Sequence, residues 1–161
     1  MTAARGIRGA AVLAIIALAL LGPEGEVAAG GPPAAACLIT QVPSLAFGDY
    51  DVTSAAPNDV QSQLRVLCDS SILMLRVNLS QGLANSFSPR AMSAGGADRL
   101  QYNVYLNEQR SMIWGDGSGG TSYYSKSRPV LEYINLYGRI PAKQGVRAGT
   151  YSDTLKLTIY Y

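Results

Sequence analysis

The amino-acid sequence predicts an all-β fold, an antiparallel β-sandwich, and three observations support this. The sequence contains seven short strand-like segments, and 60–68, 72–79, 100–106 and 154–161 alternate apolar with polar residues, which is the period of a half-buried strand. Turn-forming residues separate these segments, and no helical period continues over a long window without Gly, Pro or Asn. Short strands joined by turns favour a sandwich over a helical or mixed fold. The expected strands are 37–42, 45–50, 60–68, 72–79, 100–106, 130–140 and 154–161.

Residues 1–29 have the pattern of an export signal. Arg5 and Arg8 give a positive start, 10–21 is an apolar run, and 27–29 offers small residues for cleavage. The apolar run is shorter than the roughly 20 residues that span a bilayer, so we expect no membrane-spanning segment. We therefore expect the signal to take no part in the fold, and the remaining protein to leave the cytoplasm.

Removal of the signal leaves 132 residues, enough for one domain. We place this domain at 37–161, after a short Gly/Pro/Ala leader at 30–36. Cys37 and Cys68 would enter an oxidising compartment, where a disulfide between them would stabilise the fold by about 3 to 4 kcal/mol. A lipoprotein acylated at Cys37 is the less favoured alternative, because that cysteine lies far from the apolar run. A zinc site is disfavoured because the sequence has no histidine.

The charge pattern argues against nucleic acid and anionic membranes as partners. The net charge is +2, and it stays +2 without the signal, which carries two arginines and two glutamates. Lysine and arginine are scattered and form no basic run.

The middle strands have apolar faces that we expect to be buried. The stretch 130–140 is a longer apolar run that ends at Pro141, which lacks the N–H needed for a strand ladder. The segments 80–96 and 115–120 contain many turn-forming residues. The expected buried faces are Val60, Leu64, Val66 and Cys68; then Leu73, Leu75, Val77 and Leu79; then Leu100, Tyr102, Val104 and Leu106.

The last expected strand has the strongest alternation. Leu155, Leu157, Ile159 and Tyr161 share one face, and the residues between them are polar or exposed types. A strand that comes last has no successor in its own chain, so its free edge needs a partner.

No catalytic, cofactor or metal site is expected. The glycine-rich stretch 116–120 contains a serine, but a serine nucleophile lacks its usual base in a sequence without histidine. The same stretch has no Lys-Ser or Lys-Thr ending of a phosphate-binding loop. Asp49 with Asp51, or Glu108 with Asp116, resemble the carboxylate pairs of glycosidases, but we interpret them as solvated turn residues.

Aromatic residues gather near the glycine-rich stretch. Trp114 precedes it, and Tyr123 and Tyr124 follow it. Exposed aromatic rings can stack on sugars, so these three residues are a candidate binding patch. The alternative is that strand tyrosines are simply good β-formers.

Several short motifs occur together between Cys37 and the end of the sequence. They are LAFGDYD at 45–51, VLC at 66–68, PRAM at 89–92, LQYNVY at 100–105, WGDG at 114–117, YGRIPA at 137–142 and AGTYSDT at 148–154. In order and spacing they resemble the spore coat protein U domain, which is also the domain of archaic chaperone–usher pilus subunits.

This resemblance implies an incomplete immunoglobulin-like sandwich that is completed by a donated strand. A periplasmic chaperone would hold the subunit, an outer-membrane usher would assemble it, and other pilus or coat subunits would supply the strand. Such pairing uses main-chain hydrogen bonds for affinity and alternate side chains for specificity. Leu155, Leu157, Ile159 and Tyr161 would then border the acceptor groove, and the protein would pass through the periplasm to the cell surface, a fibre or a spore coat.

The leader differs from the donor segment that a polymerising subunit of this kind needs. The leader 30–36 contains Pro32 and Pro33 and no large apolar residue, which makes it a poor donor strand. The protein would accept a strand rather than donate one. It would cap a fibre, or belong to a coat that assembles otherwise, or be cleaved earlier to give a longer donor. A fibre-tip adhesin or carbohydrate-binding module that uses the aromatic patch is the alternative function.

Overall fold

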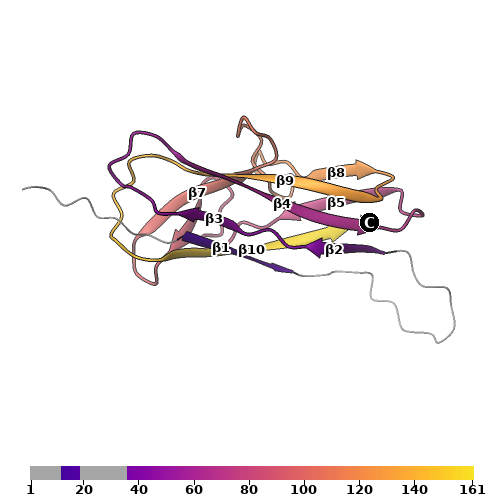
Figure 1. Ribbon diagram of the computed structural model, residues 1–161, viewed down its shortest axis with the longest axis horizontal. Helices are drawn as coiled ribbons and strands as arrows, with labels where there is room; N and C mark the ends of the chain where they lie inside the picture. Colours follow the sequence, from indigo (N-terminus) through magenta and orange to yellow (C-terminus); the bar gives the residue numbers. More distant parts are fainter. Residues whose placement is uncertain (1–11, 19–35) are drawn as a thin grey trace, which may run out of the picture.

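The computed structural model describes residues 12–18 and 36–161 of the 161-residue chain. All regular elements in these ranges are strands, which confirms the all-β prediction (Figure 1). They are β1 (Val12–Leu18), β2 (Cys37–Gln41), β3 (Leu45–Gly48), β4 (Asn58–Cys68), β5 (Met74–Leu79), β6 (Arg90–Ser93), β7 (Arg99–Tyr105), β8 (Tyr124–Ser127), β9 (Leu131–Ile140) and β10 (Tyr151–Tyr160). The described residues contain no helix that is long and apolar enough to cross a membrane.

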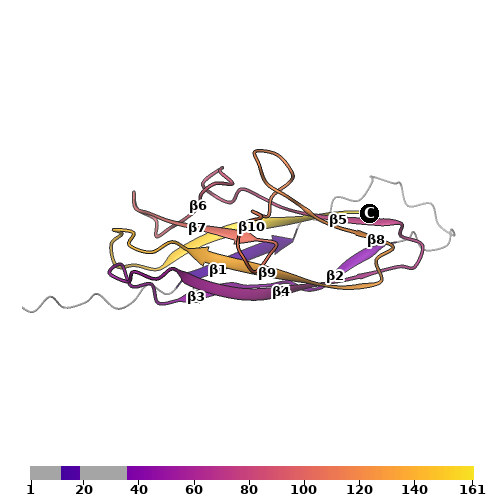
Figure 2. The ribbon, with the colours of Figure 1, turned by 90° about the horizontal axis from the view of Figure 1, so that it is seen from above.

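The strands form two packed layers. The first layer has the order β2-β4-β9-β7 and is antiparallel throughout. The second layer has the order β3-β1-β10, with β6 and β5 both on the far edge of β10 and β8 beside β5. In Figure 2, β4 and β9 lie on one side of the molecule, and β5 and β10 lie on the other.

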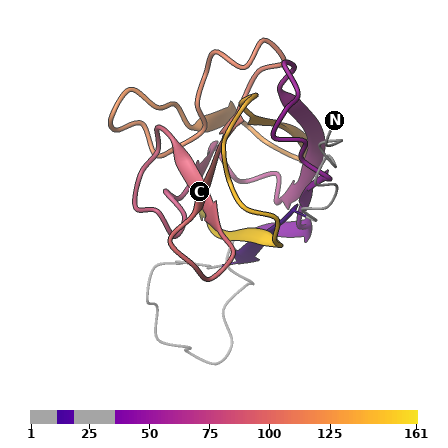
Figure 3. The same ribbon diagram turned by 90° about the vertical axis from the view of Figure 1, so that its left-hand side faces the viewer.

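Strand β7 connects the two layers. Its first half pairs with β6 in the second layer, and its second half pairs with β9 in the first. The end-on view in Figure 3 shows the strands arranged around the middle of the molecule. The largest fully buried apolar side chains include Trp114, Tyr102, Tyr151, Leu45, Leu64, Leu75, Leu79, Met92, Leu100, Leu136 and Ile140.

Most of the expected strands are present, but two short ones were not expected. Strand β6 lies inside the segment that we assigned to turns, and β8 follows the glycine-rich stretch. Each has only four residues, which is too short for a clear alternation, and β8 reads Tyr-Ser-Lys-Ser. The prediction that Leu73 shares a buried face was wrong: it is 72% exposed, because it precedes the first residue of β5.

The disulfide prediction is confirmed. Cys37 and Cys68 are bonded, with an S–S distance of 2.04 Å, and they are directly opposite each other in the register of β2 and β4. The bond therefore fastens the beginning of the domain to the end of β4.

Part of the expected export signal is in the sheet. Val12–Leu18 forms β1, which lies between β10 and β3, parallel to β10 and antiparallel to β3. The expectation that this run takes no part in the fold therefore does not hold for the full-length chain. An apolar run with Val and Ile has the composition of a buried strand as well as that of a signal. The signal and its cleavage stay predictions, and the rest of 1–35 lies outside the described residues.

Candidate functional site

The candidate site is the place that β1 occupies between two edges of the second layer. One edge is β10, which pairs with β1 from Tyr151 to Leu157. The other edge is β3, whose only ladder among the described strands is with β1. We call the space between these two edges the slot. Strand β1 is thus the one described strand that joins β10 to β3.

The β10 side of the slot alternates between buried and exposed side chains. Tyr151, Asp153, Leu155 and Leu157 are each no more than 1% exposed, with β1 in place. The β1 positions in register with them are Val12, Ala14, Ile16 and Leu18. A strand with apolar residues at alternate positions therefore matches this edge.

Two residues that we expected to border the slot lie elsewhere. Ile159 is buried, but it lies beyond the last β1 pair and faces Val77 across the opposite edge of β10. The prediction that Tyr161 shares the buried face was wrong, because it follows the end of β10 and is 46% exposed.

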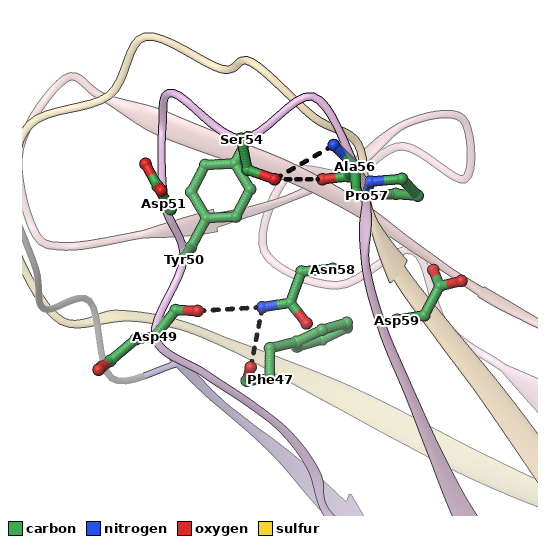
Figure 4. A pocket seen from close by; sticks show the side chains of 9 residues that line it. All are labelled: Phe47, Asp49, Tyr50, Asp51, Ser54, Ala56, Pro57, Asn58 and Asp59. Carbon is green, nitrogen blue, oxygen red and sulfur yellow. Dashed lines mark hydrogen bonds between the residues drawn. The ribbon is translucent and has the colours of Figure 1, made fainter.

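The β3 side of the slot is attached to the first layer rather than to β10. The amide of Asn58 on β4 donates to the carbonyl of Phe47 at 2.9 Å, as Figure 4 shows. Beyond β3, the hydroxyl of Tyr50 donates to the carbonyl of Pro141 at 2.7 Å. A Cβ on Gly138 would lie 2.7 Å from the Phe47 ring, so glycine is needed for this close packing. These contacts attach β3 and the residues after it to the first layer and do not involve β1.

The pocket beside β3 in Figure 4 does not bring the carboxylates together. Its volume is about 540 Å³, and the side chains of Asp49 and Asp51 point away from each other. The Thr53 hydroxyl and backbone N–H hold the pKa of Asp51 below its usual value. Asp59 forms an ion pair with Arg139 at 2.7 Å. Asp49 and Asp51 are exposed residues of a turn, as expected.

A buried arginine begins β6, the strand between β7 and β10. Arg90 on β6 has no exposed surface. Its guanidinium donates to the carbonyl of Ser80 at 2.8 and 2.9 Å, to Oδ1 of Asn103 at 2.7 Å and to the carbonyl of Trp114 at 2.6 Å. Burial lowers the pKa of Arg90 to about 10, so the group remains charged at neutral pH. Hydrogen bonds satisfy this charge, as a buried cation requires.

A buried carboxylate lies next to this arginine, at the slot. Asp153 on β10 accepts hydrogen bonds from the Tyr102 hydroxyl at 2.7 Å and from the N–H of Leu83 at 2.8 Å. Burial, and then the nearby Asp153 charge, raise the pKa of Tyr102. Asp153 is in register with Ala14 of β1. Its hydrogen bonds therefore fix the part of β10 that borders the slot.

Sequence reasoning did not identify this polar network. A charged residue in a turn-rich segment is normally exposed, so Arg90 gave no sign of burial. The only indication in the sequence was that the members of this network lie in the short motifs noted above. PRAM supplies Arg90, LQYNVY supplies Tyr102 and Asn103, WGDG supplies the Trp114 carbonyl, and AGTYSDT supplies Asp153.

The expected aromatic patch does not form as we described it. Trp114 is fully buried, and its indole N–H donates to the carbonyl of Val77 at 3.0 Å, so no ligand can reach it. Tyr123 is 40% exposed and stacks on Arg76, whose Cζ lies 3.8 Å from the ring centroid. Tyr124 is half-buried, and its hydroxyl donates to a glutamate carboxylate. No group of three or more metal-ligating side chains occurs in the part of the chain that the structure describes.

Comparisons with known proteins agree with this architecture. The family model of the Spore Coat Protein U domain matches residues 27–158. Protein U of Myxococcus xanthus is 34% identical over 131 aligned residues, which cover 73% of this chain and 72% of that protein.

A solved structure has a similar fold. It is a chain from the CsuC–CsuE chaperone–tip adhesion subunit pre-assembly complex of the archaic chaperone–usher Csu pili of Acinetobacter baumannii. The TM-score is 0.55 and the sequence identity is 24%, with 79% of this chain covered. The match spans 40% of the length of that chain.

Proposed function

Because the chain belongs to the Spore Coat Protein U domain family, we propose that it is a structural subunit of a surface fibre or spore coat that accepts a strand from another protein. The observation that supports this is the slot, whose β10 and β3 edges are joined by β1 alone among the described strands. A partner strand would enter it by β-augmentation, in which main-chain hydrogen bonds give affinity and alternate side chains give specificity.

The need for a partner follows from loss of β1. If cleavage removes residues 1–29, β10 and β3 lose the strand between them, and an unpaired edge is an aggregation risk. A periplasmic chaperone would cover the slot during export. At an outer-membrane usher, another subunit would then replace the chaperone in the slot. The solved chain with a similar fold comes from a chaperone–subunit pre-assembly complex, which supports the chaperone step of this proposal. The protein would act outside the cytoplasm, without an enzymatic role or a cofactor.

The leader supports acceptance rather than donation. Residues 30–36 include Pro32 and Pro33, which cannot donate to a strand ladder, and none has a large apolar side chain. Such a segment would fill a neighbouring slot poorly. We therefore place the subunit at the end of a fibre, or in a coat whose subunits do not form a continuous chain of donors.

Export with and without a chaperone tests this function. Exported alone, the protein is expected to aggregate or to be degraded; co-expressed with the chaperone of an archaic pilus system, it is expected to accumulate as a soluble one-to-one complex. The measurement is the soluble periplasmic yield and its mass by size exclusion with light scattering. A stable monomer of residues 30–161 that needs no chaperone would contradict the proposal.

A pair of neighbouring substitutions tests the slot itself. Leu157→Asp is expected to abolish chaperone capture, because Leu157 is fully buried against the slot; Lys156→Asp is expected to retain most of it, because Lys156 is exposed. The amount of co-purified chaperone is measured. Leu157→Met conserves volume and should restore capture. Equal capture by the two aspartate variants would exclude this edge as the binding site.

A further inference from the structure

A second pocket opens on the outer face of the second layer, on the side of β10 away from the slot. Its volume is about 300 Å³. Its floor is Asn78 of β5 with Thr158 and Tyr160 of β10. Asn78 is paired with Thr158 across that edge, and Tyr160 is paired with Arg76. The loop after β5 forms one wall, and the loop before β8 forms the other. The wall residues are Ser80, Gln81, Phe87, Asp116 and Ser118.

Asn78 presents a hydrogen-bond donor to this pocket. The residue is only 9% exposed, although it lies on the outer face of the sheet. Its Oδ1 accepts a hydrogen bond from Nε of Arg76 at 2.8 Å, which fixes the orientation of the amide. Among the described residues no group accepts from its Nδ2 nitrogen. An amide nitrogen carries two donors, and this nitrogen keeps accessible surface through which a ligand can accept from them.

Asp116 presents an acceptor on the adjacent wall. Its Oδ1 accepts hydrogen bonds from the N–H of Ser118 at 2.9 Å and from the Ser118 hydroxyl at 2.6 Å. These bonds lower the pKa of Asp116, so the carboxylate is ionised. Arg76 also donates to the backbone carbonyl of Asp116 at 2.6 Å. One arginine therefore positions both the amide and the loop, so a ligand meets a site that is already formed.

The remaining floor residues add a ring and a hydroxyl. Tyr160 is 47% exposed, and its ring centroid lies 5.5 Å from Cζ of Arg76. No hydrogen bond from the Thr158 hydroxyl is present within the described residues. An aromatic ring beside a fixed amide donor, a fixed carboxylate and a hydroxyl complements a sugar, which has an apolar C–H face and hydroxyls that both donate and accept.

We propose that this pocket binds a single neutral pyranose ring through Asn78, Asp116, Thr158 and Tyr160. Its volume suits one ring and is at the small end of ligand sites. An acidic sugar is disfavoured, because Oδ2 of Asp116 accepts no hydrogen bond from the described residues and would repel a second carboxylate. The site lies on the opposite edge of β10 from the slot, so it does not depend on the proposed strand acceptance.

Saturation-transfer NMR on the full-length chain tests this pocket. The probes are glucose, galactose, mannose and N-acetylglucosamine, with N-acetylneuraminic acid as the acidic comparison. At least one neutral sugar is expected to bind in the millimolar range, more tightly than the acidic sugar. Absence of binding by all four neutral sugars at about ten times that concentration would overturn the proposal, as would preference for the acidic sugar.

Matched variants locate the binding. Thr158→Val and Tyr160→Ala are each expected to weaken binding about tenfold, through loss of a hydrogen bond and of a stacking surface respectively. Thr154→Val changes an exposed threonine of the same strand outside the pocket, and Tyr161→Ala changes a tyrosine of similar exposure outside it. Both controls are expected to bind normally. Binding that survives Thr158→Val and Tyr160→Ala would overturn the assignment.

Discussion

Replacing Arg90 by alanine is expected to lower the free energy of unfolding by about 3 to 5 kcal/mol, the cost of breaking a buried charged network. Arg90 has no exposed surface, and it satisfies the carbonyls of Ser80 and Trp114 and the side chain of Asn103. Alanine would leave these acceptors without their donor and would open a cavity at the same place. A loss of this size is a large part of the stability of an ordinary domain.

Denaturant unfolding of the full-length protein, with its disulfide intact, measures this effect. Arg99→Ala is the control, because Arg99 is an exposed arginine on β7, directly paired with β6; we expect a change within about 0.5 kcal/mol. Arg90→Met fills most of the volume without supplying donors. This variant loses the hydrogen bonds but leaves little cavity, so its loss of stability reports the hydrogen bonds alone. We expect it to remain clearly less stable than the unchanged protein. If Arg90→Ala were as stable as Arg99→Ala, the network would have no structural role.

Alternation predicted the long strands well. In β4, β7 and β10 the residues on the expected faces are buried, apart from half-buried Val60. Half-buried Leu106 and exposed Tyr161 each lie one residue beyond the end of their strand. Side chains on successive residues of a strand point to opposite faces, so a half-buried strand leaves this pattern in the sequence. The pattern fails for β6 and β8, whose four residues each are too few to show a period.

Burial that depends on distant contacts could not be predicted. Trp114 precedes a glycine-rich loop, so we considered it as part of a candidate exposed patch, with a structural role for these aromatic residues as the alternative. Its indole N–H is satisfied by Val77, which is 37 residues away in the sequence. Arg90 is satisfied in the same way by three separate segments. Such partners become visible only when the strands are placed side by side.

Strand β1 shows a different limit of prediction from sequence. An apolar run with a positive start has the composition of an export signal, and the same run fits a buried strand position. Composition cannot distinguish the two. The register shows only how the run fits as a strand: it places Ile16 opposite buried Leu155 and Ile15 opposite exposed Thr154, and the export signal stays a prediction.

For a chain that begins at Gly30, we expect the free energy of unfolding to fall by about as much as the total stability of an ordinary domain, which is about 5 to 15 kcal/mol. It lacks β1, so the edges of β10 and β3 lose the strand between them. Leu45, Leu155 and Leu157, which are fully buried in the full-length chain, would border an open slot. Uncovering such side chains costs about 1.5 to 3 kcal/mol each. Thermal unfolding and soluble yield, compared with the full-length chain, measure this loss.

A peptide added in trans should restore what is lost. The peptide carries the β1 sequence, VLAIIAL, extended by lysines for solubility, and it is expected to raise the unfolding temperature of the chain 30–161. An aspartate at the position of Ile16 should abolish this rescue, because the register places it opposite buried Leu155. An aspartate at the position of Ile15, opposite exposed Thr154, should leave most of it. Equal rescue by the two aspartate peptides would mean that the slot does not select alternate residues, and a chain 30–161 as stable as the full-length protein would mean that it needs no strand at all.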